Sequence, residues 1–346
     1  MLTHAYAAFS ADSPLRPHTL ERRSPRPDDV VIRILYSGIC HSDIHTARSE
    51  WGPTQYPCVP GHEIVGEVIS VGKKVKKFKK GDRAGVGCFV DSCGKCSPCK
   101  SHEEQFCSSH AVFTYNSLER DGKTPTFGGY STHIVVREEY ALKIKKNQPL
   151  ERVAPLLCAG ITTYSPLKHH GIRKGHRVAV VGLGGLGHMG VKLARAMGAE
   201  VTVFSTSPHK ARDAKRLGAK HFVVSTDLSS FEKLEGYFDF ILDTVSAKHD
   251  FSPYLSTLKI DGSMVLVGAA PEPSSVHAFS LIMGRKRLSG SLIGGIRETQ
   301  EMLDFCAKKK VLSDIELISA SEINDAYERT IQGKVRYRFV IDAKTF

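Results

Sequence analysis

Four cysteines lie close together in the first third of the chain, at the spacing C-x2-C-x2-C-x7-C (Cys93, Cys96, Cys99 and Cys107). Four thiolates at this spacing can close a tetrahedral shell around zinc and leave no coordination position open. Because clustered cysteines in an intracellular chain indicate a metal sooner than disulfides, we predict a structural zinc here. A disulfide pair and an iron–sulfur cluster are the alternatives that the spacing leaves open.

A glycine-rich turn in the second half of the chain has the residues to bind a dinucleotide. The apolar run Val178–Val181 predicts a buried strand, and it leads into Gly182, Gly184 and Gly187 at the G-x-G-x-x-G spacing. The first glycine permits a sharp turn, the second lets a pyrophosphate approach the backbone, and the third lets helix and strand pack closely. A plain turn is the alternative, but the helical stretch Met189–Met197 that follows favours cofactor binding.

The residues after the next predicted strand, Glu200–Phe204, indicate which nicotinamide cofactor binds. An NAD enzyme usually has an aspartate or glutamate there to hold the ribose hydroxyl. This chain has no carboxylate at that place and instead carries Ser205, Thr206, Ser207 and Lys210. Hydroxyl groups and an ammonium suit a 2′-phosphate, which a carboxylate would repel. We therefore predict NADP(H), with a loop capped by Ser207 as the structural alternative.

Three further metal-ligand candidates, Cys40, His62 and Cys158, are dispersed along the chain. Two thiolates and an imidazole with an open fourth position make a catalytic zinc site. Taken singly, each has an ordinary explanation as a buried thiol or a core histidine. The segments around them favour the metal hypothesis: Gly38–Asp43, Pro60–Glu63 and Cys158–Tyr164.

Length and composition limit the class of protein. A chain of 346 residues predicts two domains. No stretch approaches the roughly 20 apolar residues of a membrane span, and the first residues show no secretory signal, so we expect a cytoplasmic protein without a membrane partner. The formal charge of +12 raises the hypothesis of nucleic-acid binding. The densest basic run, Lys73–Lys80, is better explained as a solvated loop or edge strand.

Short apolar runs predict the elements that position the candidate residues. The strand Val30–Tyr36 leads to Cys40 and a short helix, the strand Ile64–Gly72 follows His62, and the helical stretch Leu150–Leu167 carries Cys158. Short strands and turns between residues 81 and 136 suggest an irregular β domain. A helix over Gln300–Lys310 and a final strand over Tyr337–Ile341 are also predicted.

Strands alternate with helices between residues 177 and 293. The predicted strands are Val178–Val181, Val201–Phe204, Phe222–Val224, Phe238–Leu242, Met264–Val267 and Leu288–Ile293. Six strands of this kind predict an α/β fold with a doubly wound parallel sheet.

Together these motifs resemble those of the zinc-dependent medium-chain dehydrogenases/reductases, and most closely the cinnamyl alcohol dehydrogenase group. The resemblance covers nearly the whole chain and is carried by Cys40–His45, Gly61–Glu63, the four-cysteine segment, Gly128–Ser131, Cys158–Gly160 and Gly182–His188. It implies a Rossmann cofactor domain at 156–293. It also implies a mainly β, GroES-like catalytic domain with a zinc lobe at 1–155 and 294–346.

The resemblance implies roles in the catalytic domain. The ligands of the catalytic zinc correspond to Cys40, His62 and Cys158. Glu63 would lie beside the zinc as a transient fourth ligand or a supporting group, and Asp43 would bond to the free ring nitrogen of His62. Ser42 and His45 match a relay that passes the alcohol proton through the cofactor ribose towards the surface, although Ser42 is also suited to cap a helix.

Cofactor and substrate contacts follow from the same resemblance. Thr162 would lie near the nicotinamide. The pyrophosphate would meet Gly182, Gly184, Gly185, Leu186 and Gly187, and backbone contacts would come from Val267, Gly268, Ala269, Ser291 and Ile293. Trp51, Phe113 and Ile293 are substrate-pocket candidates. Phe113 aligns where plant enzymes often have tryptophan, which implies a roomier aromatic wall.

The implied activity is the reversible reduction of aldehydes to primary alcohols with NADP(H), two zinc ions per chain and a homodimer joined through the cofactor domains. Aromatic or allylic aldehydes such as cinnamaldehyde are the expected substrates. An NAD-linked polyol or aliphatic alcohol dehydrogenase shares the scaffold, but the missing acid at Ser205 counts against it. A zinc-containing nucleic-acid-binding protein would leave the glycine turn and the dispersed ligands unexplained.

Overall fold

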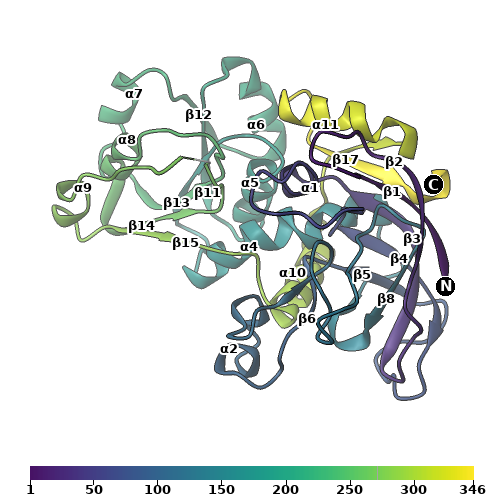
Figure 1. Cartoon of the computed structure of the whole chain (residues 1–346). Coiled ribbons are helices and arrows are strands. Elements are labelled where there is room, and N and C mark those ends of the chain that lie inside the picture. The colour runs from purple at the N-terminus through teal and green to yellow at the C-terminus, as the bar shows by residue number, and fades with distance from the viewer. Residues whose placement is uncertain (271) are drawn as a thin grey trace. The chain divides into compact units, whose positions relative to one another are not determined.

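Six parallel strands form the sheet of the segment between residues 159 and 293 in the computed structural model, which describes residues 1–270 and 272–346 (Figure 1). The strands are β10 (Arg177–Val181), β11 (Glu200–Ser205), β12 (His221–Val224), β13 (Phe238–Asp243), β14 (Leu258–Leu266) and β15 (Arg287–Gly290). Their order across the sheet is β12-β11-β10-β13-β14-β15. This is the doubly wound order of a dinucleotide-binding fold, and it confirms the predicted α/β class.

Helices connect these strands and cover the sheet. They are α4 (Ala159–His169), α5 (Gly187–Ala196), α6 (Ala211–Leu217), α7 (Ser229–Glu232), α8 (Ser252–Ser256) and α9 (Phe279–Ile282). Because helices pack on both faces, the central strand is buried throughout from Val178 to Val181. An aromatic cluster around Phe204, Phe231 and Tyr254 fills one side of this core.

A second, mixed sheet is built around the long strand β3 (Asp29–Gly38). It has the order β16-β17-β3-β4-β5-β9, and β8 also pairs with β3. The partners are β4 (Ile64–Val71), β5 (Arg83–Val86), β8 (His133–Arg137), β9 (Leu142–Lys143), β16 (Ile315–Ile318) and β17 (Arg338–Asp342). The last strand of the chain therefore lies beside one of the first, as the sequence predicted for the tail.

Smaller elements surround this sheet. They are the strands β1 (Leu2–Ala7), β2 (Arg16–Glu21), β6 (Phe89–Asp91) and β7 (Val112–Phe113), and the helices α1 (His41–Ala47), α2 (Ser97–Lys100), α3 (Leu150–Val153), α10 (Ile296–Lys309) and α11 (Ile323–Ile331). The core beneath α1 and α11 includes Ile44, Tyr130, Tyr327 and Phe339, all nearly inaccessible to solvent. This core holds the first turn of α1 in place.

The chain divides into two compact units, one made of residues 1–158 with 294–346 and the other of residues 159–293. The first carries the mainly β, GroES-like pattern and the second the Rossmann pattern. Among the described residues, no helix combines the length and apolar character needed to cross a membrane.

Three predicted elements differ from the structure. The helical stretch over Leu150–Leu167 is broken into α3, the 3₁₀ helix η3 (Ala154–Leu157) and α4, because Pro155 cannot continue a regular helix. The strand predicted to reach Ile293 ends at Gly290, and Ile293 has a left-handed φ of 38° that a strand cannot contain. The helix α10 begins at Ile296, four residues earlier than predicted.

Candidate functional site

Four potential metal ligands meet inside the first unit: Cys40, His62, Glu63 and Cys158. Their ligand atoms all lie within 4.8 Å of one another, and all four residues are buried. The two Sγ atoms of Cys40 and Cys158 are 3.9 Å apart. Cys40 is the N-cap of α1 and Cys158 ends η3, so the breaks between elements bring the dispersed ligands together.

The donor set fits zinc. Within the described chain, Nε2 of His62 is buried and has no hydrogen-bond partner, which is the state of an imidazole nitrogen that faces a metal. Two thiolates, one imidazole and a nearby carboxylate are ligands that Zn²⁺ prefers. The hydrogen bond with Cys158 lowers the pKa of the Cys40 thiol well below its usual range, so one thiolate forms readily.

Asp43 is the buried centre of the hydrogen bonds that support this cluster. One of its oxygens lies 3.2 Å from Nδ1 of His62 and accepts from the amide of Gly61 at 3.0 Å. The other accepts from the amide of Cys40 at 2.8 Å and from the hydroxyl of Tyr130 at 3.1 Å. Asp43 thus contacts both a histidine and a cysteine of the candidate metal site, and its role in orienting them stays a prediction.

Arg338 is a functional residue that the sequence did not reveal. It lies on β17, is almost fully buried, and donates from Nη2 to Glu63, a partner 275 positions earlier in the chain. Burial raises the pKa of Glu63 to about 7, and the guanidinium of Arg338 opposes that rise. No motif or spacing links two residues so far apart, so only the pairing of β17 with β3 could have shown this contact.

Two other residues beside the cluster were also missed. The ring of Tyr115 stacks on His62, with centroids 5.7 Å apart and planes 12° apart. Hydrogen bonding with Cys158 lowers the pKa of the Cys88 thiol, which places Cys88 against the same cluster. Phe113, the predicted pocket aromatic, lies on β7 and is 47% exposed, so it is Tyr115 that the structure brings to the metal ligands.

The proposed relay residues lie along α1. The hydroxyl of Ser42 is 3.6 Å from Sγ of Cys40, beside the metal cluster. His45 lies one turn further along the helix, where Nδ1 contacts the carboxylate of Glu50 and the ring stacks on Trp51. The indole of Trp51 is 57% exposed. The roles of these residues stay predictions, and their order along α1 leads from the cluster towards solvent.

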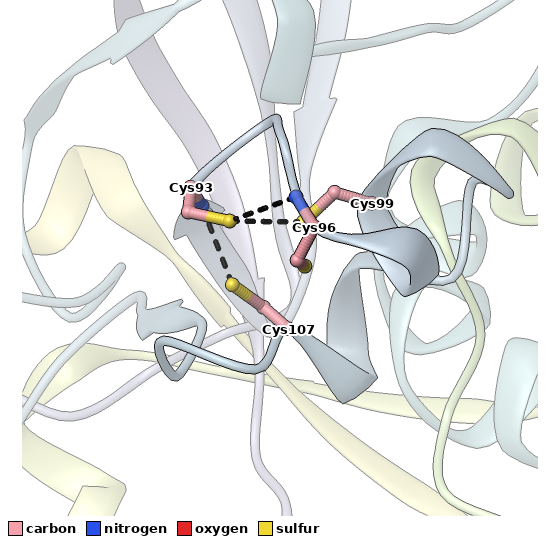
Figure 2. Close-up of side chains that lie close together, drawn as sticks. All are labelled: Cys93, Cys96, Cys99 and Cys107. Atoms are coloured by element: carbon pink, nitrogen blue, oxygen red, sulfur yellow. Dashed lines mark hydrogen bonds between the residues drawn. The ribbon is translucent and has the colours of Figure 1, made fainter.

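The four cysteines of the zinc lobe converge as their spacing predicts (Figure 2). Their Sγ atoms lie within 4.8 Å of one another, and Sγ of Cys93 accepts from the amide of Cys96 at 3.4 Å. The amide of Cys93 in turn donates to Sγ of Cys107 at 3.3 Å. Backbone amides of Cys99 and Ser108 lower the pKa of the Cys96 thiol to about 6. Amide-to-sulfur bonds of this kind stabilise thiolates, as a tetrahedral zinc site requires.

The glycine turn in the second unit has the geometry that a pyrophosphate site needs. Gly182 has a φ of 87°, and a Cβ on Gly187 would come within 2.1 Å of the carbonyl oxygen of Gly182. A Cβ on Gly184 would meet nothing within 4 Å, so the backbone there is open to a ligand. The turn leads into α5, whose N-terminal end favours an anion.

The remaining predicted cofactor residues gather at the carboxyl ends of the parallel strands. Ser205 ends β11, Val267 and Gly268 follow β14, and Ser291 follows β15. The Nζ of Lys210 donates to the carbonyl of Leu183 at 3.0 Å, which places its ammonium beside the glycine turn. Thr162 is buried, whereas Thr206 and Ala269 are exposed. The remaining contacts stay predictions: Thr162, Thr206, Ser207, Ala269, Gly185, Leu186 and Ile293.

Comparisons with known proteins agree with this geometry. Residues 26–146 match the family model "Alcohol dehydrogenase GroES-like domain", and residues 185–308 match "Zinc-binding dehydrogenase". The NADP-dependent alcohol dehydrogenase C of Mycobacterium bovis is 56% identical over 98% of this chain and 97% of its own length. The aldehyde reductase YahK of Escherichia coli is 54% identical over 100% of this chain and 99% of its own.

Solved structures show the same similarity. A cinnamyl alcohol dehydrogenase from Sorghum bicolor has a TM-score of 0.96 at 44% identity, covering 99% of this chain and 98% of that one. A cinnamyl alcohol dehydrogenase from Helicobacter pylori, solved with NADP(H), has a TM-score of 0.93 at 49% identity and covers 99% of both chains. The chain is therefore an oxidoreductase that belongs to the zinc-dependent medium-chain alcohol dehydrogenases. Within that family it falls in the cinnamyl alcohol dehydrogenase group.

Proposed function

We propose that this protein interconverts aldehydes and primary alcohols with NADP(H). The proposal depends on the buried cluster of Cys40, His62 and Cys158, in which Nε2 of His62 has no hydrogen-bond partner among the described residues. The chain also has a glycine turn suited to a dinucleotide, and no carboxylate stands at Ser205, where an NAD enzyme usually has one. The relatives named above as NADP-dependent alcohol dehydrogenase and aldehyde reductase support it.

Different residues of the chain have different roles in this reaction. Cys40, His62 and Cys158 would hold the catalytic zinc, and Asp43 keeps the imidazole in the tautomer that presents Nε2. When bound, zinc supplies a Lewis acid for the carbonyl oxygen and NADPH supplies the hydride. In the direction of reduction, the hydroxyl of Ser42 donates a proton to the product oxygen.

The proton given up by Ser42 is restored along α1. His45, which the cofactor ribose would connect with Ser42, is the next group with a transferable proton. Its contact with Glu50 and its partial exposure suit exchange of that proton with solvent. Oxidation of an alcohol uses the same groups in the reverse order.

Aromatic or allylic aldehydes are the proposed substrates, with NADPH preferred over NADH. The aromatic ring of Tyr115, which stacks on His62 beside the candidate metal ligands, supports this preference. An oxidation screen of NADPH and NADH across aliphatic, allylic and aromatic aldehydes tests both statements. A clear preference for NADH with polyols would support the alternative, an NAD-linked polyol dehydrogenase.

The metal assignment has its own test. Zinc analysis should find two ions per chain in the wild type and one in Cys40→Ser. The activity of this variant should fall by about a thousandfold or more, because several kcal/mol of charge stabilisation is lost. Its melting temperature should change little, since the four-cysteine lobe is intact. Full activity of Cys40→Ser would refute the assignment.

We also propose a homodimer formed through the cofactor-binding unit. The strand β15 is the last of its sheet, and exposed apolar side chains gather near it: Ile260, Phe279, Ile282 and Met283. An open strand edge with apolar neighbours is suited to pairing with a second copy.

A cytoplasmic location is part of the proposal. It is supported by the nine cysteines, all of which are free, because a reducing compartment preserves thiols for metal binding. Cell fractionation with an antibody against the protein tests it.

A further inference from the structure

The residues after α1 fold back over the last turn of that helix. The amide of Glu50 donates to the carbonyl of His45 at 2.9 Å, and the amide of Ser49 donates to the carbonyl of Thr46 at 3.0 Å. Ser49 has a φ of 54°. These two bonds and the left-handed Ser49 define a Schellman motif at the C-cap Arg48. In this motif the second residue after the C-cap packs against the third residue before the C-cap. The backbone therefore brings Glu50 against His45.

Two side chains of this turn contact the ring of His45. The carboxylate of Glu50 contacts Nδ1. The indole of Trp51 stacks on the ring, with centroids 4.6 Å apart and planes 23° apart. The ring of His41 lies further away, with its centroid at 6.2 Å. One edge and one face of the imidazole are thus engaged, and Nε2 is the nitrogen left to receive the relay proton.

The turn itself is anchored. The hydroxyl of Tyr56 donates to the carbonyl of Ala47 at 2.9 Å and lies 3.0 Å from the hydroxyl of Ser49. The hydroxyl of Thr54 donates to the carbonyl of Thr46 at 2.6 Å. Because the turn is fixed at several points, Trp51 is held over the histidine by the backbone and not by the stack alone.

We propose that Trp51 is a positioning residue for the proton relay: its indole holds the imidazole of His45 in the orientation that exchanges the relay proton. The inference rests on the proposed function, in which His45 is the outer group of the relay. A partly exposed imidazole turns easily about its second side-chain torsion, and the stack restricts that rotation. Indole is also the ring face best suited to contact the imidazolium that forms when the proton arrives.

The sequence suggested a different role for Trp51, as a wall of the substrate pocket. The two roles have different kinetic consequences. A substrate wall affects KM and does so differently for each aldehyde. A positioning residue affects the proton transfer, which is common to all aldehydes, and therefore lowers kcat by a similar factor for each.

Fluorescence tests the contact directly, because Trp51 is the only tryptophan of the chain. Protonated imidazole quenches indole on contact, so the emission of the zinc-loaded enzyme should be weaker in acid than at neutral pH. The charged groups around His45 are Glu50, His41 and the Arg48–Glu328 pair, which links α1 to α11. His45→Asn should abolish the pH-dependent step, and the control His41→Asn should keep it. A step that survives His45→Asn would overturn the proposed contact.

Kinetics test the consequence. Trp51→Leu should lower kcat by about two- to fivefold for aliphatic and aromatic aldehydes alike, with KM nearly unchanged. Trp51→Phe, which keeps a stacking ring, should restore most of kcat. A substrate-dependent change in KM with unchanged kcat would overturn the positioning role. If the wild type reduces no aldehyde with NADPH, the proposed function fails, and the fluorescence titration still decides whether the stack exists.

Discussion

His62 is held on one face of its ring and at one edge, and its Nε2 has no hydrogen-bond partner among the described residues. Tyr115 stacks on its face, and Asp43 lies against Nδ1. A neutral imidazole whose Nδ1–H points to a carboxylate must present the lone pair of Nε2, which is the form that binds a metal. The supporting residues therefore decide the chemistry of this histidine as much as its position does.

The absence of a carboxylate at Ser205 leads to a prediction about cofactor choice. Ser205→Asp should reduce kcat/KM for NADPH by about ten- to a hundredfold, because the new charge would repel the 2′-phosphate, and it should spare NADH. The ratio of kcat/KM values for the two cofactors is the measurement. The control Ser205→Ala removes only a hydroxyl and should keep the preference for NADPH. An unchanged ratio in the aspartate variant would place the ribose elsewhere.

The buried pair of Arg338 and Glu63 leads to a second prediction. Arg338→Met should lower the free energy of unfolding by about 3–5 kcal/mol, because it leaves a buried carboxylate without its partner. Denaturant unfolding of the zinc-loaded protein measures this loss. The double variant Arg338→Met with Glu63→Gln should recover part of it. Equal stability of the single and double variants would show that Glu63 is neutral in the native protein.

The sequence predicted the metal ligands because each of them stands in a recognisable segment. Cys40, His62 and Cys158 do meet in space, and so do the four cysteines of the lobe. Arg338, Tyr115 and Cys88 could not be predicted, because a lone arginine, tyrosine or cysteine has no periodicity or spacing that marks it. Their place in the site depends on strand pairing between distant parts of the chain.

At the scale of elements, the zinc lobe is connected to the helix α10. The carboxylate of Glu104, just inside the lobe, accepts from the amide of Ile296 at 3.0 Å, at the N-terminal end of that helix. The hydroxyl of Ser92 lies 3.1 Å from Sγ of Cys99 and 2.8 Å from the hydroxyl of Tyr140, so it connects the lobe with Tyr140. Loss of metal from the lobe would therefore loosen more than the lobe itself.

Cys96→Ser should accordingly destabilise the protein, unlike Cys40→Ser. The lobe has little apolar core of its own, so zinc binding supplies its folding energy. We expect one zinc per chain and a melting temperature lowered by roughly 5–10 °C, from a loss of a few kcal/mol. Calorimetry with zinc analysis measures both values. A melting temperature equal to that of the wild type would mean that the lobe folds without its metal.

Glu200, the first residue of β11, contacts residues that directly precede β12 and β13, and its pKa leads to a prediction about how stability depends on pH. Hydrogen bonds from Lys220 and Tyr237 lower its pKa to about 2. A depressed pKa contributes stability above pH 4.5, the ordinary value, and that contribution disappears as the pH falls towards 2. Because the carboxylate is partly exposed and screened by solvent, we expect only about 0.5 kcal/mol.

Glu200→Gln should therefore be less stable than the wild type at neutral pH, and the two unfolding curves should converge in acid. Urea unfolding over a series of pH values measures the difference. Glu232→Gln, at an exposed glutamate of the same unit, is a matched control for the loss of one carboxylate. A difference that grows in acid would contradict the assignment.

Element boundaries were predicted less well than the elements themselves. All six strands of the Rossmann sheet were predicted, and the central ones, β10, β11 and β13, most clearly, because parallel strands buried on both faces are continuous apolar runs. The break at Cys158 was not, although Pro155 stands three residues before it. Pro155 was the one local sign of this break, and the apolar, helix-forming residues around it favoured a continuous helix in the prediction.

At the scale of the whole molecule, the proposed dimer leads to a prediction about assembly. Met283→Glu, next to β15, should shift the protein to a monomer, because a buried charge at an apolar interface is costly. Sedimentation analysis measures the change. Leu228→Glu, which changes an exposed leucine elsewhere in the same unit, is a matched control. A dimer that persists in Met283→Glu would place the interface on another surface.

The division of the chain into two units implies an order in which they can fold during synthesis. The cofactor-binding unit is one continuous segment, so it can fold as soon as residue 293 has left the ribosome. The first unit cannot, since β3 pairs with β17 and Glu63 pairs with Arg338, and both partners follow residue 293 in the chain. Until β17 has been synthesised, the nascent chain leaves the end of β3 that pairs with β17 without its partner. The protein is thus able to bind its nucleotide before it can complete its metal site.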